Sequence, residues 1–233
     1  MARIPGPPGG PAELEITLRR SGQARRMSLR VSGLDGQVTL TLPTRVPAAE
    51  GLAFARERSG WIAQALARVP QVRPVGVGAL ILLEGVERAV LAGPARGAVK
   101  VTEAGVVVPG DPAQAGVRVA TFLRALARDR LVAASDRHAA LLGRPYAGVT
   151  LRDTRSRWGS CTAAGGLMYC WRLVMAPPAV LDYVAAHEVA HLAEMNHSPR
   201  YWAVVRRLLP GYEAPRRWLK VHGSGLHAYR FLD

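Results

Sequence analysis

Residues 187–197 read His-Glu-Val-Ala-His-Leu-Ala-Glu-Met-Asn-His. Residues four apart share one face of a helix, so His187 and His191 can both reach a single ion. Glu188 lies beside them and can hold a water on that ion. His197 follows the point where such a helix can end, and a chain that turns back there supplies a third ring nitrogen. Because three protein ligands with one open position are typical of a catalytic zinc, the stretch predicts a zinc hydrolase.

Interpretations without a catalytic metal also remain open for the histidines and cysteines. The histidines of this stretch can be surface or core residues of an ordinary helix. His138 is distant in sequence, and a structural place on a helix suits it better than a metal-binding role. Cys161 and Cys170 are spaced too widely for a C-x-x-C metal pair, although either remains a conceivable zinc ligand.

Length and composition set the broad class. A chain of 233 residues with 49% hydrophobic content forms one large domain or two small ones around a real core. The sequence contains no long uncharged apolar run, so no membrane span is expected. Residues 1–12 are rich in Pro and Gly and lack the apolar segment of a signal peptide. They predict a disordered lead-in, and the cytoplasm is the expected compartment.

The chain is strongly basic, with a formal net charge of +14 and nearly all of its 31 basic residues arginine. Such a charge favours contact with polyanions, either nucleic acid or an acidic protein surface. The arginines are scattered, however, which is more typical of a solvated basic face. The clearest clusters are Arg152/Arg155/Arg157, Arg206/Arg207 and Arg216/Arg217.

The pattern along the chain predicts an α+β fold. Alternating apolar and polar residues at 13–20, 27–31 and 38–42 predict an antiparallel meander, and residues 47–69 predict one helix that buries Trp61. Short strands are expected between 79 and 108. Residues 109–112, Pro-Gly-Asp-Pro, interrupt regular secondary structure. They predict a boundary between an N-terminal β-rich region, 13–112, and a second region, 113–233.

The second region is expected to be mostly helical around a small sheet. Residues 117–142 predict a long helix that Gly143 ends. Strands are expected at 149–153 and 168–173, and the two prolines at 177 and 178 suit the start of the metal-binding helix. Further helices are expected at 199–209 and 213–221.

Several short motifs together resemble one known family. They are Arg-Trp-Gly-Ser-Cys at 157–161, Trp-Arg-Leu at 171–173, Ala-Pro-Pro at 176–178, the histidine stretch, Asn-His-Ser-Pro-Arg-Tyr-Trp at 196–202 and Arg-Trp-Leu at 217–219. In these motifs the chain resembles the YgjP-like metallopeptidase domain, which is grouped with the SprT and WLM types of minimal zincin. The resemblance implies a zincin-like fold, with an active-site helix packed on a small sheet. It also implies zinc on His187, His191 and His197, and Glu188 as the catalytic acid/base. Glu194 stands where the metzincins have glycine, which sets this chain apart from that group.

The expected function is zinc-dependent hydrolysis of peptide bonds in a protein or peptide substrate. Glu188 takes the proton of the attacking water and passes it to the leaving amine. The substrate lies extended along a sheet edge, either 168–172 or 157–161. Tyr201, His222, His227 and Arg172 are open candidates for stabilising the oxyanion, and Glu194 and Asn196 either orient the ligands or cap the helix.

Two other functions remain open. One is a basic nucleic-acid-associated module in which zinc mainly holds the fold, with little or no proteolysis. The other is a metal-dependent hydrolase of a non-peptide substrate. Related SprT proteins include proteases that cut DNA-attached proteins, and extending that substrate to this chain is an analogy.

Overall fold

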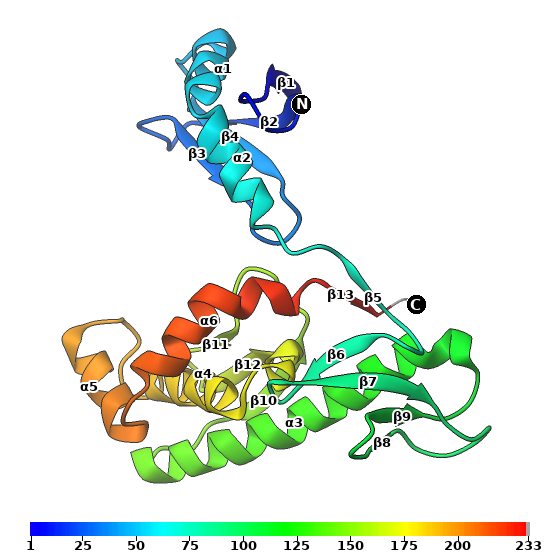
Figure 1. Ribbon diagram of the computed structural model, residues 1–233. Helices are drawn as coiled ribbons and strands as arrows, with labels where there is room; N and C mark the ends of the chain where they lie inside the picture. Colours follow the sequence, from blue (N-terminus) through cyan, green and yellow to red (C-terminus); the bar gives the residue numbers. More distant parts are fainter. Residues whose placement is uncertain (232–233) are drawn as a thin grey trace. The chain divides into compact units, whose positions relative to one another are not determined.

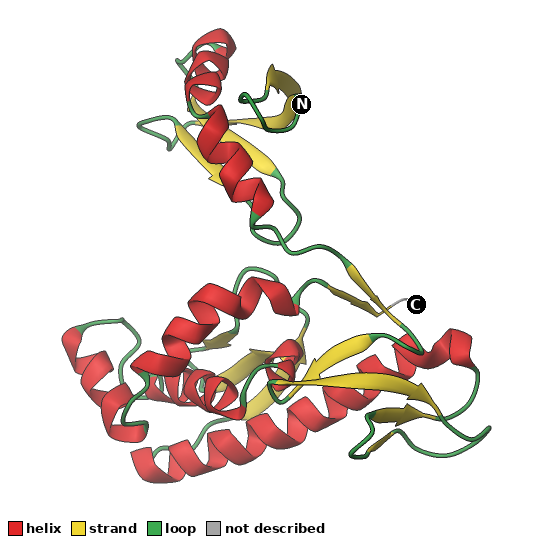
Figure 2. Ribbon diagram, viewed as in Figure 1, coloured by secondary structure: helices red, strands yellow, loops and turns green. Residues whose placement is uncertain are grey.

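The computed structural model describes residues 1–231, and the chain divides into two compact units between Gln71 and Val72. Both units combine helices with small open sheets (Figure 2), which confirms the α+β class. Within the described residues, no helix has the length and apolar character needed to cross a membrane.

The first unit is a four-stranded sheet covered by two helices. Its strands lie in the order β1-β2-β4-β3, and its core contains Ile4, Leu14, Ile16, Leu40 and Ile62. The elements are β1 (Ala2–Pro5), β2 (Glu13–Ser21), β3 (Ser28–Val31), β4 (Val38–Pro43), α1 (Ala48–Glu57) and α2 (Ser59–Ala67).

Four expectations for this unit are wrong in detail. Residues 1–12 are not a disordered lead-in, because Ile4 is buried in the core and β1 pairs antiparallel with β2. The sheet is mixed and not an antiparallel meander, since β2 and β4 pair in parallel while β3 takes the outer edge. One expected helix is two, with the break at Arg58 (φ −106°, ψ 14°). Trp61 is 49% exposed and does not belong to the core.

The predicted boundary at 109–112 is also wrong. Residues 72–112 form β5 (Arg73–Val75), β6 (Leu80–Leu83), β7 (Val86–Ala92), β8 (Lys100–Val101) and β9 (Val106–Val108). Ile81, Val90 and Val106 from these strands share one core with Val119 and Leu123 of the long helix α3 (Ala115–Leu142). The break follows the shared apolar core, so it falls after Gln71. Pro109 only precedes the short 3-10 turn η1 (Pro112–Gln114), and Pro112 begins it.

The second unit is organised around α3, which runs along the length of this unit in Figure 1. Gly143 ends α3 in the left-handed conformation (φ 74°), as the sequence predicts. Beyond it come β10 (Gly148–Arg152), β11 (Gly159–Cys161), β12 (Gly166–Cys170), the 3-10 turn η2 (Trp171–Met175), α4 (Pro178–Ala190), α5 (Pro199–Leu208), α6 (Glu213–Leu226) and β13 (Tyr229–Phe231).

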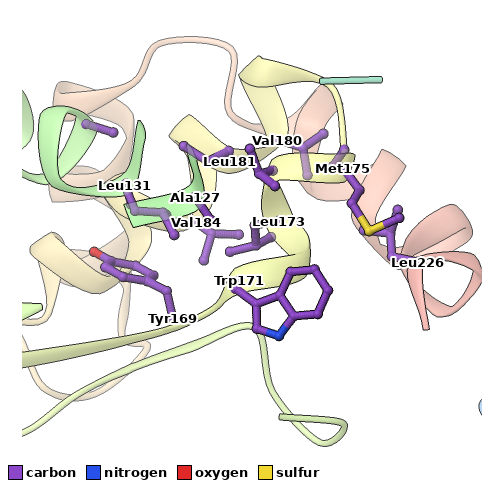
Figure 3. Close-up of a cluster of buried hydrophobic side chains, with 14 of the residues drawn as sticks. Ala127, Leu131, Tyr169, Trp171, Leu173, Met175, Val180, Leu181, Val184 and Leu226 are labelled. Carbon is purple, nitrogen blue, oxygen red and sulfur yellow. The ribbon is translucent and has the colours of Figure 1, made fainter. Parts of the chain in front are cut away.

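Helix α4 is held between α3 and the turn η2. Figure 3 shows Ala127 and Leu131 of α3, Leu173 of η2 and Val184 of α4 meeting in one apolar cluster. The predicted strand 168–173 ends at Cys170, because the next five residues turn inward as η2 and are all buried. Pro178 occupies the first turn of α4, where its missing N–H leaves no unpaired donor. This packing fixes the helix that carries His187 and His191.

The three-stranded sheet of this unit lies in the order β10-β12-β11. β10 pairs in parallel and β11 antiparallel with β12, so β12 is the central strand and β11 an edge strand. Of the two substrate edges that the sequence suggests, the segment 157–161 therefore contains an edge strand. The segment 168–172 begins in the central strand and continues into η2.

Candidate metal centre

The chain folds back on itself directly after α4. His191 is the C-terminal cap of the helix (φ −65°, ψ −19°), and the N–H groups of Ala193 and Glu194 both donate to the Ala190 carbonyl in the turn that follows. Ser198 then caps α5, accepting a hydrogen bond from the Tyr201 N–H, and Pro199 fills the first turn. His197 lies on the short connection between the two helices. The turn therefore brings it beside the histidines of α4.

The three imidazoles converge. One ring nitrogen from each of His187, His191 and His197 lies within 4.8 Å of the other two. Nε2 of His187 and Nε2 of His197 are 3.1 Å apart. Nδ1 of His191 lies 3.0 Å from the Glu194 carbonyl oxygen, so this nitrogen carries the proton and Nε2 keeps its lone pair. The residues therefore fit a divalent metal, and among the described residues they form a group that could hold one.

Tyr201 of α5 supports this arrangement from behind. Its ring is fully buried and stacks on His191, with centroids 4.5 Å apart and planes 29° apart. It also meets the ring of His197 edge-on at 4.6 Å. The Tyr201 hydroxyl donates a 3.0 Å hydrogen bond to the His187 carbonyl, near the end of α4. Tyr201 thus ties all three histidines to α5.

Burial favours the neutral form of the histidines. It lowers the pKa of His187 to about 3, and the neighbouring His191 and His197 add to this effect. Burial also lowers the pKa of His191. A neutral imidazole offers the lone pair that a metal needs. For Glu188, burial raises the pKa to about 8, against a smaller lowering by the positive charge of Arg157.

Glu188 lies against the edge strand β11, and both line a small hollow. The hollow holds about 240 Å³ and is lined by Arg157, all of β11, Met195, Glu188 and the three histidines. A Cβ atom on residue 159 would come within 2.5 Å of the Glu188 carboxylate. Glycine at 159 therefore lets the strand approach the carboxylate closely.

Comparison of the sequence with known protein families identifies its family. A family model described as the YgjP-like metallopeptidase domain matches residues 25–222. The chain belongs to the YgjP-like metallopeptidase family. No curated protein matches the sequence significantly. Among solved structures, the crystal structure of the metallopeptidase zymogen of Pyrococcus abyssi abylysin is similar at 19% identity and a TM-score of 0.36. That match covers 40% of this chain and 95% of the abylysin chain.

Membership of the YgjP-like family identifies a metallopeptidase domain and implies a metal ion. His187, His191 and His197 form the group of side chains that could bind it, and neither cysteine belongs to that group. Cys161 lies on β11 beside the hollow, and Cys170 is buried in the core. His138 is also buried, with Nε2 at 2.9 Å from Asp182 between α3 and α4, which agrees with the structural role expected for it.

None of the four residues that the sequence suggests for stabilising the oxyanion lines the hollow at the histidines, and each contacts other groups of the protein. The Tyr201 hydroxyl is bound to a helix carbonyl. Arg172 is buried, binds both carboxylate oxygens of Asp153 and donates to the carbonyls of Leu226 and Tyr229. His227 packs on Trp158, and His222 is exposed beside Trp218.

The remaining sequence expectations concerned the loop after α4. Glu194 contributes its backbone carbonyl to His191, and Asn196 accepts from the Ser198 N–H with its carbonyl. Sequence reasoning missed the contact of Gly159 with Glu188 and the ring of Tyr183 beside His187 at 5.8 Å. The contact of Tyr183 with His187 could have been predicted from the sequence, because Tyr183 lies four residues before His187 and so on the same helix face.

Proposed function

We propose that this chain is a zinc-dependent peptidase in which His187, His191 and His197 bind the metal and Glu188 is the catalytic acid/base. One observation carries the proposal: three ring nitrogens converge in the same hollow as a buried carboxylate. A purely structural metal site closes its coordination with protein ligands and needs no such carboxylate.

Zinc is the proposed metal because three imidazole ligands suit it and leave a position for chemistry. When bound there, the ion supplies a Lewis acid that acidifies water and polarises a carbonyl. The chain's own residues hold and orient it. The Glu194 carbonyl fixes the protonation of His191, and Tyr201 holds the rings in place.

Glu188 is proposed to move the proton. It follows His187 on α4 and faces the hollow from the helix side. As a carboxylate it accepts a proton from the attacking water, and as a carboxylic acid it returns that proton to the leaving amine. Its burial raises the affinity of the carboxylate for a proton, which suits a group that must accept one.

The substrate is proposed to extend along β11. This strand is at the edge of its sheet, and its residues Gly159, Ser160 and Cys161 all line the hollow. A peptide that pairs with the edge by backbone hydrogen bonds brings its carbonyl groups over the histidines. Because such pairing requires no free chain end, we propose an endopeptidase.

The test is cleavage of a mixed pool of denatured and native proteins by zinc-loaded wild type and Glu188→Gln, with and without DNA. Wild type should generate new peptide termini. Glu188→Gln should generate almost none, because an amide cannot accept the proton, and should still bind zinc. Cleavage by Glu188→Gln at the wild-type rate would contradict the role of Glu188. Absence of cleavage by the wild type under every condition would contradict the peptidase proposal.

The second candidate is a basic module in which zinc mainly supports the fold and nucleic acid is the partner. It is favoured by the net charge of +14 and by three exposed arginines: Arg152 at the end of β10, and Arg155 and Arg157 on the connection to β11. It predicts binding to DNA that weakens steeply with salt, unfolding on chelation and no cleavage of any protein. Cleavage by the wild type in the experiment above would exclude this second function, and salt-sensitive DNA binding without any cleavage would favour it.

A further inference from the structure

A second and larger hollow lies along α6. It holds about 560 Å³, and we call it the α6 pocket. Its walls are Trp158, Tyr183, Leu219 and the side chains of Glu213, Arg216, Arg217 and Lys220. Aromatic and aliphatic groups thus form part of the wall, and three cations and one carboxylate form the rest.

The α6 pocket adjoins the metal centre through three of its walls. Tyr183 precedes His187 by one turn of α4, and the two rings meet edge-on at 5.8 Å. Trp158 is the residue before Gly159, which contacts Glu188. The guanidinium of Arg216 lies 4.4 Å over the ring of Trp202, and that ring is 6.0 Å from His187. A peptide over the histidines therefore has this pocket within reach of a side chain.

The aromatic residues that line the α6 pocket, Trp158 and Tyr183, are held in place by packing against neighbouring side chains and helix α6. A Cβ atom on Gly223 of α6 would lie 2.9 Å from the ring of Trp158, so glycine there allows the ring to press against the helix. His227, the C-terminal cap of α6, also packs on this ring, with centroids 5.0 Å apart. Tyr183, which also lines the pocket, stacks on Tyr212, and Tyr212 stacks on Trp202.

The pocket carries excess positive charge. Glu213 is 3.7 Å from Arg206 of α5, so its charge is balanced from outside the pocket. Arg216, Arg217 and Lys220 are exposed, and none has an ion-pair partner among residues 1–231. Stacking on Trp202 uses the face of the Arg216 guanidinium and leaves its in-plane N–H groups able to donate.

We propose that the α6 pocket binds an acidic side chain of the substrate peptide and so sets cleavage specificity, an inference that rests on the proposed peptidase function. The methylene groups of an aspartate or glutamate pack against Trp158 and Leu219. The carboxylate lies among the three cations, where charge-assisted hydrogen bonds form. Nucleic acid is the less suitable occupant, because the cations line a bounded hollow beside the metal centre and do not follow an extended track of the kind that a phosphate backbone requires.

The first experiment is cleavage of a peptide library by wild type, the double variant Arg217→Glu/Lys220→Glu and the control Arg128→Glu, which changes an exposed arginine on α3. Wild type and the control should favour Asp or Glu at one fixed position from the cleaved bond. The double variant should lose that preference by about tenfold or more and accept Lys or Arg there. Cleavage with no acidic preference, or the same preference in the double variant, would overturn this inference and leave the proposed function standing.

The second experiment measures binding without turnover. Zinc-loaded Glu188→Gln protein is titrated at low ionic strength with labelled peptides in which one glutamate moves along an uncharged background, and with the matching glutamine set. One glutamate position should bind about tenfold more tightly than its glutamine partner, and only the Arg217→Glu/Lys220→Glu change should abolish the difference. Equal binding of both sets would overturn the inference, as would tighter binding of a labelled oligonucleotide that the same double change abolishes. A glutamate preference in binding with no cleavage by wild type would support the pocket and overturn the proposed function alone.

Discussion

Gly159 and Glu188 are in direct contact: a Cβ atom on residue 159 would lie 2.5 Å from Oε1 of Glu188, 2.6 Å from its Cγ and 2.8 Å from its Cδ. No ordinary side chain fits such a gap. The edge strand β11 and the carboxylate on α4 therefore hold each other in position. A peptide paired with β11 would lie against the carboxylate proposed to be catalytic.

Gly159→Ala should lower peptidase activity by about 100-fold while zinc binding is kept, because the added methyl group displaces Glu188 or the strand by a fraction of an ångström or more. The measurement is the cleavage rate together with zinc content. Gly148→Ala is the matched control, since a Cβ on this glycine of β10 meets nothing within 4 Å. Wild-type activity in Gly159→Ala would contradict the role given to this contact.

Tyr201 offers a graded test of how the histidines are held. Tyr201→Phe removes only the hydrogen bond to the His187 carbonyl and should lower the free energy of unfolding by about 1 kcal/mol. Tyr201→Ala also removes the ring that packs on His191 and His197, and should weaken zinc binding by about 10- to 100-fold. Competition with a chromogenic chelator measures the affinity. Equal zinc affinity in Tyr201→Ala and wild type would show that the ring does not position the ligands.

Asp153 should make stability depend on pH. Burial tends to raise the pKa of its carboxyl, but the hydrogen bonds and charge of Arg172 outweigh burial, and the pKa in the folded protein is lowered. A lowered pKa stabilises the folded state above the unfolded pKa of about 3.9, and the contribution disappears as the pH falls through the folded value.

Asp153→Asn should therefore destabilise the fold at pH 7 by about 1–3 kcal/mol, because buried Arg172 loses its counter-charge. The difference from wild type should shrink as the solution is acidified below about pH 4. Denaturant unfolding followed by tryptophan fluorescence reports on the unit concerned, since Trp158, Trp171, Trp202 and Trp218 all lie in it. Asp129→Asn, an exposed change on α3, is the control. A difference that stays constant from neutral to acidic pH would contradict the linkage.

Metal removal should destabilise the second unit, which contains the three histidines. A ligand that binds only the folded state adds about 2.7 kcal/mol at a concentration 100 times its dissociation constant. A chelator should therefore lower the thermal midpoint of the wild type and leave His191→Ala unchanged. An equal decrease in both proteins would point to an effect of the chelator other than removal of this metal.

The features of the fold that depend on residues close together in the sequence could be predicted from it. The spacing of His187 and His191, the left-handed Gly143 and the proline at the start of α4 all act within a turn or two of helix. For that reason the long helix, the histidine-bearing helix and the convergence of His197 could be expected from the amino-acid sequence alone.

Contacts between distant segments could not be predicted in the same way. The pairing of β1 with β2 depends on one buried residue, Ile4, in a Pro- and Gly-rich segment. The parallel pairing of β2 with β4 skips β3, and periodicity alone does not set the order of strands. The close approach of Gly159 to Glu188 is a contact of the same kind, because these two residues become neighbours only when β11 packs against α4.

The most direct test of the account is metal analysis of protein purified without added metal. Wild type, Glu188→Gln and His222→Ala should each contain about one zinc ion per chain, since none of these changes removes a proposed ligand. His191→Ala and His197→Ala should each lose most of it. A wild-type protein without zinc, or a His191→Ala protein with the full content, would contradict the account.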